Sequence, residues 1–105
     1  METLNKIDKI IKRNGQLVEF NPEKITFAIY KAFRAIGRPD RQKAEKYGQQ
    51  VVERLQASTN MKVPSVEEIQ DLVERTLFDN GEFEAGKAYV IYRYQHQNIR
   101  QTKEL

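Results

Sequence analysis

Residues 7–20 read IDKIIKRNGQLVEF, in which two β-prone runs flank the dipeptide Asn14-Gly15. This dipeptide is the strongest short-range signal for a two-residue type I′ turn, so the segment predicts a β-hairpin. A two-residue loop pairs Ile11 with Val18, and alternation then places four apolar side chains on the face toward a core: Ile7, Ile11, Val18 and Phe20. A single hairpin is not stable in water, so helices are expected to cover that face.

Helical patterns fill the rest of the chain. Asn21 is a good N-cap, Pro22 suits the first helical position, and Gly37 ends the first apolar run. Ser65 and Glu68 have the spacing of a capping box and mark another helix start. The four expected helices begin near Pro22, Asp40, Ser65 and Glu82 and end near Gly37, Ala57, Gly81 and Arg100, with a loop over residues 57–63. These signals predict one α+β domain over residues 1–105, in which a small hairpin-based sheet packs with about four helices.

The composition limits the class of protein. The chain has 105 residues, a size typical of one domain with one modest core, and no cysteine. The missing thiols exclude disulfides, thiolate zinc sites, iron–sulfur clusters and a catalytic cysteine. No apolar run approaches the ~18–20 residues of a membrane span, and the first residues lack the apolar region of a secretory signal. A cytoplasmic chain that does not enter a membrane is therefore expected.

The net charge of +3 conceals a segregation along the chain. Residues 1–46 carry 11 Lys and Arg against 6 Asp and Glu, residues 47–86 carry 3 against 8, and residues 87–105 carry 4 against 1. A chain that is basic at both ends and acidic in the middle can gather its basic ends around an anion. Solvated helix faces of mixed sign are the plainer interpretation of the same pattern.

Catalytic arrangements are hard to assemble from these residues. The only histidine, His96, lies in the polar stretch YQHQN near the end of the last expected helix, where a surface position is the simplest interpretation. Four carboxylates at helical spacing resemble a metal or acid–base cluster, but the helix dipole favours acidic side chains near a helix start: Glu67, Glu68, Asp71 and Glu74. We therefore expect neither a catalytic nor a metal site in this chain.

Basic residues around the hairpin are better candidates for a binding site. The common phosphate loops are absent, but Lys12 and Arg13 lie at the hairpin tip and Lys24 lies in the first turn of the following helix. A cation at a helix start is favoured when an anion lies between it and the helix. On a flat strand Lys12 and Arg13 point to opposite faces, so both reach one pocket only if twist near the turn redirects one of them.

The last helix is expected to close this pocket. Lys87 and Arg93 are basic residues of that helix, but they are six residues apart and lie on different parts of its surface. Tyr89 and Tyr92 have the i, i+3 spacing of neighbours on one face, where they either stack on a base or line the core.

Four blocks of sequence, in this order and spacing, resemble the ATP-cone domain: KRNG at 12–15, FNPEKI at 20–25, PSVEEI at 64–69 and KAYVIYR at 87–93. With the runs that join them they cover residues 7–100. ATP-cones are nucleotide-sensing modules found at the start of many ribonucleotide reductases and in a repressor of reductase genes. The repressor carries a four-cysteine zinc ribbon before its cone, so a chain without cysteine is not of that version.

The resemblance implies a small sheet packed with four helices that binds ATP or dATP as an allosteric effector without turnover, with Mg²⁺ as a candidate companion of the triphosphate. It implies phosphate contacts for Lys12, Arg13 and Lys24, and a place in the base pocket for Ile11. Weaker implied nucleotide contacts fall on Asn21, Lys87, Tyr92 and Arg93. The implied partner is a ribonucleotide reductase catalytic region or subunit, in cis or in trans, whose activity is regulated through oligomerisation.

Two other functions would use these residues differently. A small basic nucleic-acid-binding module would use the hairpin and the last helix, although the acidic middle of the chain and the lack of a nucleic-acid motif argue against it. Steeply salt-dependent binding to random oligonucleotides would favour that alternative. An ATP-hydrolysing enzyme lacks a candidate base in this sequence, and phosphate release with Mg²⁺ would be its signature.

Overall fold

The computed structural model describes residues 7–58 and 63–104. It contains a two-stranded antiparallel sheet and four helices, which confirms the predicted α+β fold. The elements in chain order are β1 (Lys9–Ile11), β2 (Leu17–Glu19), α1 (Pro22–Ala35), α2 (Arg41–Ser58), α3 (Val66–Asp79) and α4 (Phe83–Glu104). No helix in these two ranges is long and apolar enough to cross a membrane.

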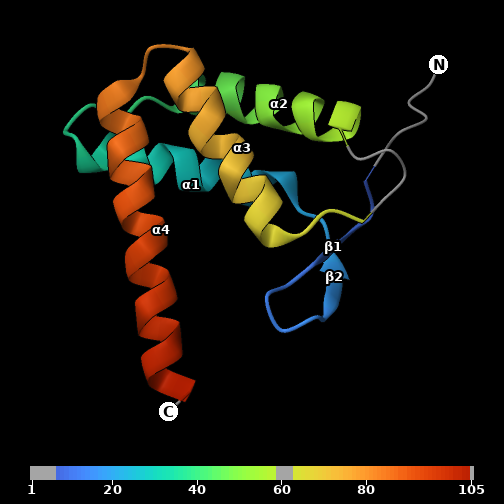
Figure 1. The fold of residues 1–105 in the computed structure, drawn as a ribbon. Helices are drawn as coiled ribbons and strands as arrows, with labels where there is room; N and C mark the ends of the chain where they lie inside the picture. The colour runs from blue at the N-terminus through green and yellow to red at the C-terminus, as the bar shows by residue number, and fades with distance from the viewer. Residues whose placement is uncertain (1–6, 59–62, 105) are drawn as a thin grey trace.

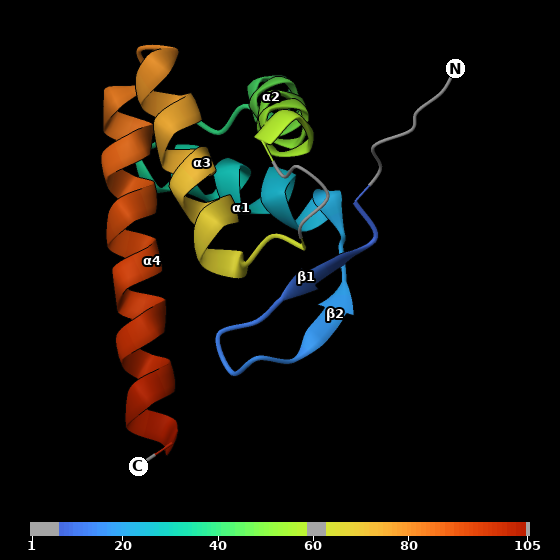
Figure 2. The same cartoon turned by 45° about the vertical axis from the view of Figure 1, so that its right-hand side comes forward.

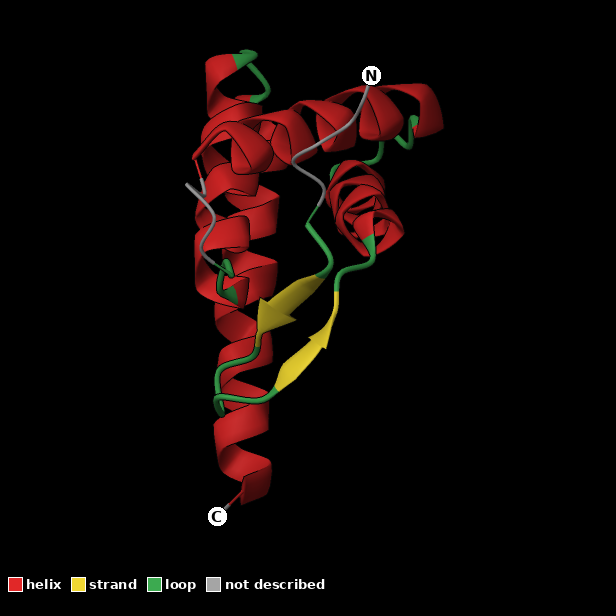
Figure 3. Ribbon diagram, turned by 90° about the vertical axis from the view of Figure 1, so that its right-hand side faces the viewer, coloured by secondary structure: helices red, strands yellow, loops and turns green. Residues whose placement is uncertain are grey.

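The helices form a closed set of neighbours, because α1 and α3 each pack against both α2 and α4. The C-terminal half of α4 extends beyond the other helices, and the hairpin lies on the same side of the molecule as this extension (Figures 1 and 2). Figure 3 shows the two strands in front of α4, with α1 beginning directly after β2. The hairpin, the starts of α1 and α3, and α4 are thereby brought to one end of the fold.

The core lies between the four helices and is apolar. Its least exposed side chains, at most 1% exposed, include Ile29 on α1, Val51 and Leu55 on α2, and Leu77 on α3. The hairpin adds partly buried side chains at the edge of this core: Ile7, Ile10 and Phe20. Each of these helices therefore buries one apolar stripe, as the spacing in the sequence predicts.

The helix boundaries follow the predicted capping residues. Asn21 accepts a hydrogen bond from the Glu23 N–H (3.0 Å), with Pro22 in the first helical position. The Ser65 hydroxyl accepts from the Glu68 N–H (3.1 Å) while the Glu68 carboxylate accepts from the Ser65 N–H (2.9 Å), which completes the capping box. The starts of α1 and α3 are therefore fixed by local sequence. The middle of the expected loop, residues 59–62, lies outside the described residues.

The predicted hairpin register was wrong by one residue. The Gly15 N–H donates to Lys12 O and the Lys12 N–H donates to Gln16 O, both at 2.8 Å, so the loop has three residues. Gly15 has φ +87°, the left-handed conformation that closes such a loop with a bulge. The extra loop residue pairs Ile10, instead of Ile11, with Val18. Ile10 and Val18 therefore face the helices, while Ile11 takes the other face.

The start of α3 is attached to the hairpin by the main chain. The Ile11 N–H donates to Pro64 O (2.9 Å), and Ile11 forms a single parallel bridge with Ser65. The edge of β1 that does not pair with β2 is thus partly covered, and Ser65, the residue before α3, is held beside the hairpin.

Glu82, at the turn into α4, gives a pH-dependent contribution to stability. Its carboxylate accepts from the Tyr47 hydroxyl (2.7 Å) and pairs with Lys43 (3.1 Å). Burial raises the pKa of Glu82, but these two contacts outweigh burial and leave the pKa below its usual value. Burial, together with the bond to Glu82, raises the pKa of Tyr47 to about 12.

We expect Tyr47→Phe to lower the free energy of unfolding by about 1–2 kcal/mol at neutral pH, because a partly buried hydrogen bond to a charged group is lost. Since the pKa of Glu82 is lower in the folded state, its contribution is present above the ordinary glutamate pKa and is lost as pH falls through the folded value. The difference between the variant and the unmutated chain should therefore shrink below about pH 4. Urea unfolding of both proteins at neutral pH and below about pH 4 measures this difference in the free energy of unfolding. An equal difference at the two pH values would show that the Tyr47 hydroxyl does not stabilise the fold through the Glu82 carboxylate.

Candidate functional site

A cavity of about 400 Å³ opens between the hairpin, the first turns of α1 and α3, and the middle of α4. Its volume is in the range of small-molecule and cofactor sites. It lies at the end of the fold where elements distant in sequence meet. Figure 2 shows this end, with the hairpin facing α4. The cavity therefore depends on the tertiary fold and not on one continuous segment.

One part of the lining is apolar and aromatic. Ile25, Ile69, Val73 and Tyr89 are buried side chains that form its inner surface. Burial raises the pKa of Tyr89, so this phenol stays neutral. The remaining members of this surface are Ile10, Val18, Phe20, Ala28, Val66, Tyr92 and His96.

The aromatic residues of this lining come from α4. The Tyr92 ring lies 6.3 Å from the Tyr89 ring and 4.1 Å from the His96 ring between centroids. Lys31 of α1 contacts the Tyr92 hydroxyl (3.4 Å) and lies 5.2 Å from the centre of its ring. This wall offers flat surfaces on which a planar heteroaromatic group can stack.

The other part of the lining is cationic. Lys12, Arg13, Lys24 and Arg93 all line the cavity, together with one carboxylate, Glu19. Lys12 lies on the cavity face of the hairpin because the three-residue loop sets the register, and Arg13 lies within the loop. The predicted conflict between opposite strand faces therefore does not arise, since β1 ends at Ile11 and neither residue lies on a flat strand.

Lys12 and Lys24 differ from the two arginines in their partners. Within residues 7–58 and 63–104 no ion pair is found for either lysine, whereas Arg13 pairs with Glu67 (3.2 Å). Lys24 lies in the first turn of α1 next to the N-cap Asn21, where the helix dipole adds positive potential. A ligand with several negative charges would compensate all of these groups at once.

Arg93 is held by two acidic residues of α3. Its guanidinium contacts Glu74 (2.7 Å) and Asp71 (2.9 Å), and its side chain is only 17% exposed. Burial lowers the pKa of Arg93, but the bonds to Glu74 and Asp71 outweigh burial and raise it. Arg93 thus ties α4 to α3 and its charge is already matched.

The acidic cluster predicted to serve the helix dipole has more specific partners. Glu68 completes the capping box, Glu67 pairs with Arg13, and the remaining two carboxylates hold Arg93. Among the described residues no group of three or more histidine and acidic side chains is placed to hold a metal ion.

Six of the eight residues predicted for the site line this one cavity: Lys12, Arg13, Asn21, Lys24, Tyr92 and Arg93. Ile11 does not, because the register places Ile10 there instead. Lys87 is exposed on α4 outside the lining. His96 is exposed, as expected, but it also lines the cavity, which was not predicted although its position four residues after Tyr92 places both on one helix face.

Comparison with known proteins agrees with this arrangement. The chain matches the ATP cone domain over residues 8–98. It is 40% identical over 104 residues to the vitamin B12-dependent ribonucleoside-diphosphate reductase of Thermoplasma acidophilum, covering 94% of this chain and 13% of the relative. It is 33% identical over 103 residues to the ribonucleoside-diphosphate reductase subunit alpha of Chlamydia muridarum, covering 90% of this chain and 10% of the relative. A vitamin B12-dependent ribonucleoside-diphosphate reductase of Mycobacterium tuberculosis is 30% identical over 97 residues, covering 92% of this chain and 13% of the relative.

The chain therefore spans between a tenth and about an eighth of the length of these relatives. The family match covers both strands, α1, α2, α3 and most of α4, and hence every element around the cavity. The chain belongs to the ATP cone domain family.

Proposed function

We propose that this chain is a regulatory domain that senses nucleotides by binding ATP or dATP in the cavity, without turnover. The observation that carries the proposal is the division of the lining into two parts. Lys12 and Lys24 offer charge without an ion pair in the described residues, and an aromatic wall from α4 lies across the same cavity. A nucleoside triphosphate has the same division into a polyanion and a flat base.

The phosphates are assigned to the hairpin and the start of α1. Lys12, Arg13 and Lys24 come from adjacent elements, and ammonium and guanidinium groups form the stronger, charge-assisted hydrogen bonds with phosphate oxygens. Mg²⁺ would arrive on the phosphate oxygens, because it keeps several of its waters and is commonly bound through the phosphates of a nucleotide. Phosphate release from ATP by the pure chain would contradict the absence of turnover.

The relatives named above suggest what is regulated. We propose that the domain, taken as residues 1–105, acts in the cytoplasm on a ribonucleotide reductase catalytic region, in cis or in trans. ATP and dATP differ by one 2′-hydroxyl, so opposite effects require contacts that differ between two arrangements of the protein. We assign these arrangements to oligomers of different geometry.

This regulatory step is tested by light scattering of the chain with saturating ATP or dATP. The proposal predicts that the two nucleotides give different average masses at the same protein concentration, because each favours a different assembly. The chain without nucleotide is the reference state. Identical masses in all three samples, across a wide range of protein concentration, would show that assembly does not carry the signal in this chain.

A further inference from the structure

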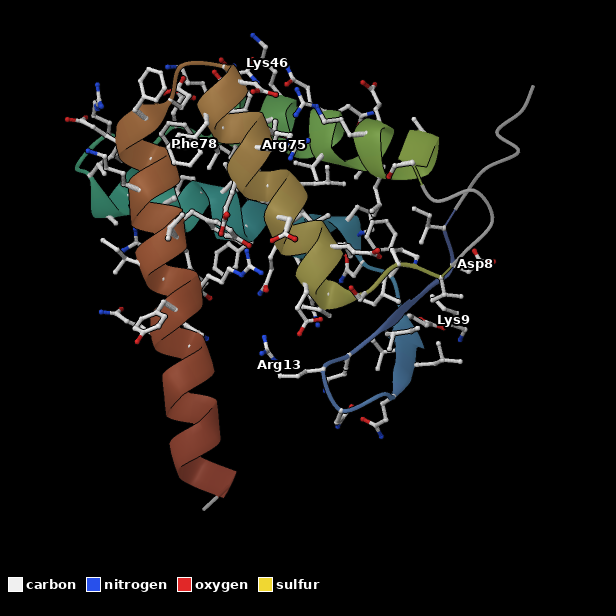
Figure 4. All side chains as sticks on the ribbon, in the orientation of Figure 1. Asp8, Lys9, Arg13, Lys46, Arg75 and Phe78 are labelled. Atoms are coloured by element: carbon white, nitrogen blue, oxygen red, sulfur yellow. The ribbon has the colours of Figure 1, made fainter. Side chains whose placement is uncertain are left out.

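The ion pair between Arg13 and Glu67 involves a guanidinium that also lines the cavity. Arg13, in the hairpin loop, contacts the Glu67 carboxylate in the first turn of α3 at 3.2 Å, and the two side chains are 36% and 37% exposed. Figure 4 shows Arg13 extending from the loop toward α4, whereas Lys9 lies on the other side of the hairpin. The same guanidinium lines the cavity, so a ligand phosphate and Glu67 would meet at one group.

Glu67 stands apart from the other acidic residues of α3. The Glu68 carboxylate caps the helix, and Asp71 and Glu74 hold Arg93, which is largely buried. Asp79, at the end of α3, pairs with Arg54 of α2. Only the Glu67 contact joins α3 to a cation at the hairpin tip among the ion pairs of the described residues. Its neighbour in the fold, the Ile11 N–H to Pro64 O bond, involves main chain alone and does not need to change when a ligand enters.

We propose that Glu67 is a built-in competitor of phosphate for Arg13. This inference rests on the proposed function, namely that the cavity binds a nucleoside triphosphate. In the empty domain the carboxylate neutralises Arg13 and ties the hairpin tip to α3. A phosphate that reaches Arg13 either displaces Glu67 or shares the guanidinium with it, and a carboxylate next to a phosphate is repelled.

The competition has two consequences. It lowers the affinity for ligands whose phosphates reach Arg13, while a ligand too short to reach Arg13 is affected less. It also makes the tie between the hairpin loop and α3 depend on the ligand, while the main-chain bond between Ile11, at the loop end of β1, and Pro64 persists. Occupancy of the cavity is thereby transmitted to the start of α3.

The test is calorimetric titration of ATP and AMP into the Glu67→Gln variant, at low and at physiological salt. An exposed pair of this kind is worth up to about 1 kcal/mol, so we expect the ATP dissociation constant to fall about two- to fivefold, with a smaller change for AMP. The gain should decrease at higher salt because screening weakens the Arg13–Glu67 attraction with which a phosphate must compete.

Glu68→Gln is the matched control, since it removes the same charge one residue away and leaves an amide oxygen to accept the capping bond. An equal gain in this control would mean that the effect is general charge and not competition. In an Arg13→Ala background the gain from Glu67→Gln should vanish, and its persistence there would overturn the proposal.

A weaker or unchanged ATP affinity of Glu67→Gln, with thermal unfolding like that of the unmutated chain, would also overturn the inference while leaving nucleotide binding intact. If the unmutated chain binds no ATP at all, the proposed function fails and the inference fails with it. Titration of ATP into the unmutated chain therefore distinguishes failure of the proposed function from failure of the inference about Glu67.

Discussion

The double variant Lys12→Ala/Lys24→Ala is expected to lose at least about 100-fold in affinity for ATP. Both lysines line the cavity, from the hairpin and from the first turn of α1. A hydrogen bond to a charged group contributes about 1.5–3 kcal/mol, and each 1.4 kcal/mol is tenfold in affinity. The loss should be the same for dATP, since the phosphates are common to both nucleotides. Calorimetry on the variant and the unmutated chain measures it.

A control with the same change in net charge is Lys9→Ala/Lys46→Ala. Lys9 is an exposed residue of the same hairpin and Lys46 is an exposed residue of α2, and neither lines the cavity. This control should change ATP affinity only slightly. If the cavity variant bound dATP as tightly as the unmutated chain, the phosphates would have to be placed elsewhere.

Arg93→Met is expected to lower the free energy of unfolding by about 1–3 kcal/mol. Removing one partner of a buried ion pair costs about 3–5 kcal/mol. We expect a smaller loss here because the Asp71 side chain is 67% exposed and can be hydrated after the change. Glu74 is only 26% exposed and would be left without its cation. Chemical denaturation in urea provides the measurement, with ATP affinity recorded on the same samples.

Arg41→Met is the comparison for this variant, because Arg41 and Glu45 form an exposed pair on α2 at 3.9 Å. We expect Arg41→Met to change the free energy of unfolding by no more than about 0.5 kcal/mol.

The ATP affinity of Arg93→Met should fall less than that of the Lys12→Ala/Lys24→Ala variant, since the charge of the Arg93 guanidinium is already matched by Asp71 and Glu74. Equal stabilities of the two arginine variants would show that Arg93 does not tie α4 to α3.

Local signals in the sequence were sufficient for the helices. Asn21 with Pro22, and Ser65 with Glu68, satisfy main-chain groups within a few residues of themselves, so their effect does not depend on the rest of the fold. The apolar spacing likewise predicted the buried faces. This is why the architecture and the positions of most helix ends could be predicted.

The hairpin register could not be predicted from the dipeptide Asn14-Gly15. Asn-Gly suits a two-residue turn, but the same glycine also suits the last position of a three-residue loop, and the choice between them shifts every pair by one. Packing of Ile10 against the helical core decides it. This shift is also the reason that Ile10, and not Ile11, lines the cavity.

The lining of the cavity was predictable where its residues come from adjacent segments and less so where contacts join segments across the fold. Lys12, Arg13 and Lys24 are close in sequence and were found together. The pairs of Arg13 with Glu67 and of Arg93 with Glu74 join distant segments, so no local spacing reveals them. In both pairs a basic residue from one end of the chain meets an acidic residue of the middle, and both basic residues line the cavity.

The most direct test is calorimetric titration of the unmutated 105-residue chain with ATP, dATP and adenosine, beside a random oligonucleotide. We expect saturable binding of both triphosphates and loss of most of the affinity for uncharged adenosine. We also expect no preference for the oligonucleotide over free nucleotide. No saturable binding of ATP or dATP, or steeply salt-dependent binding of the oligonucleotide alone, would contradict nucleotide sensing by this chain.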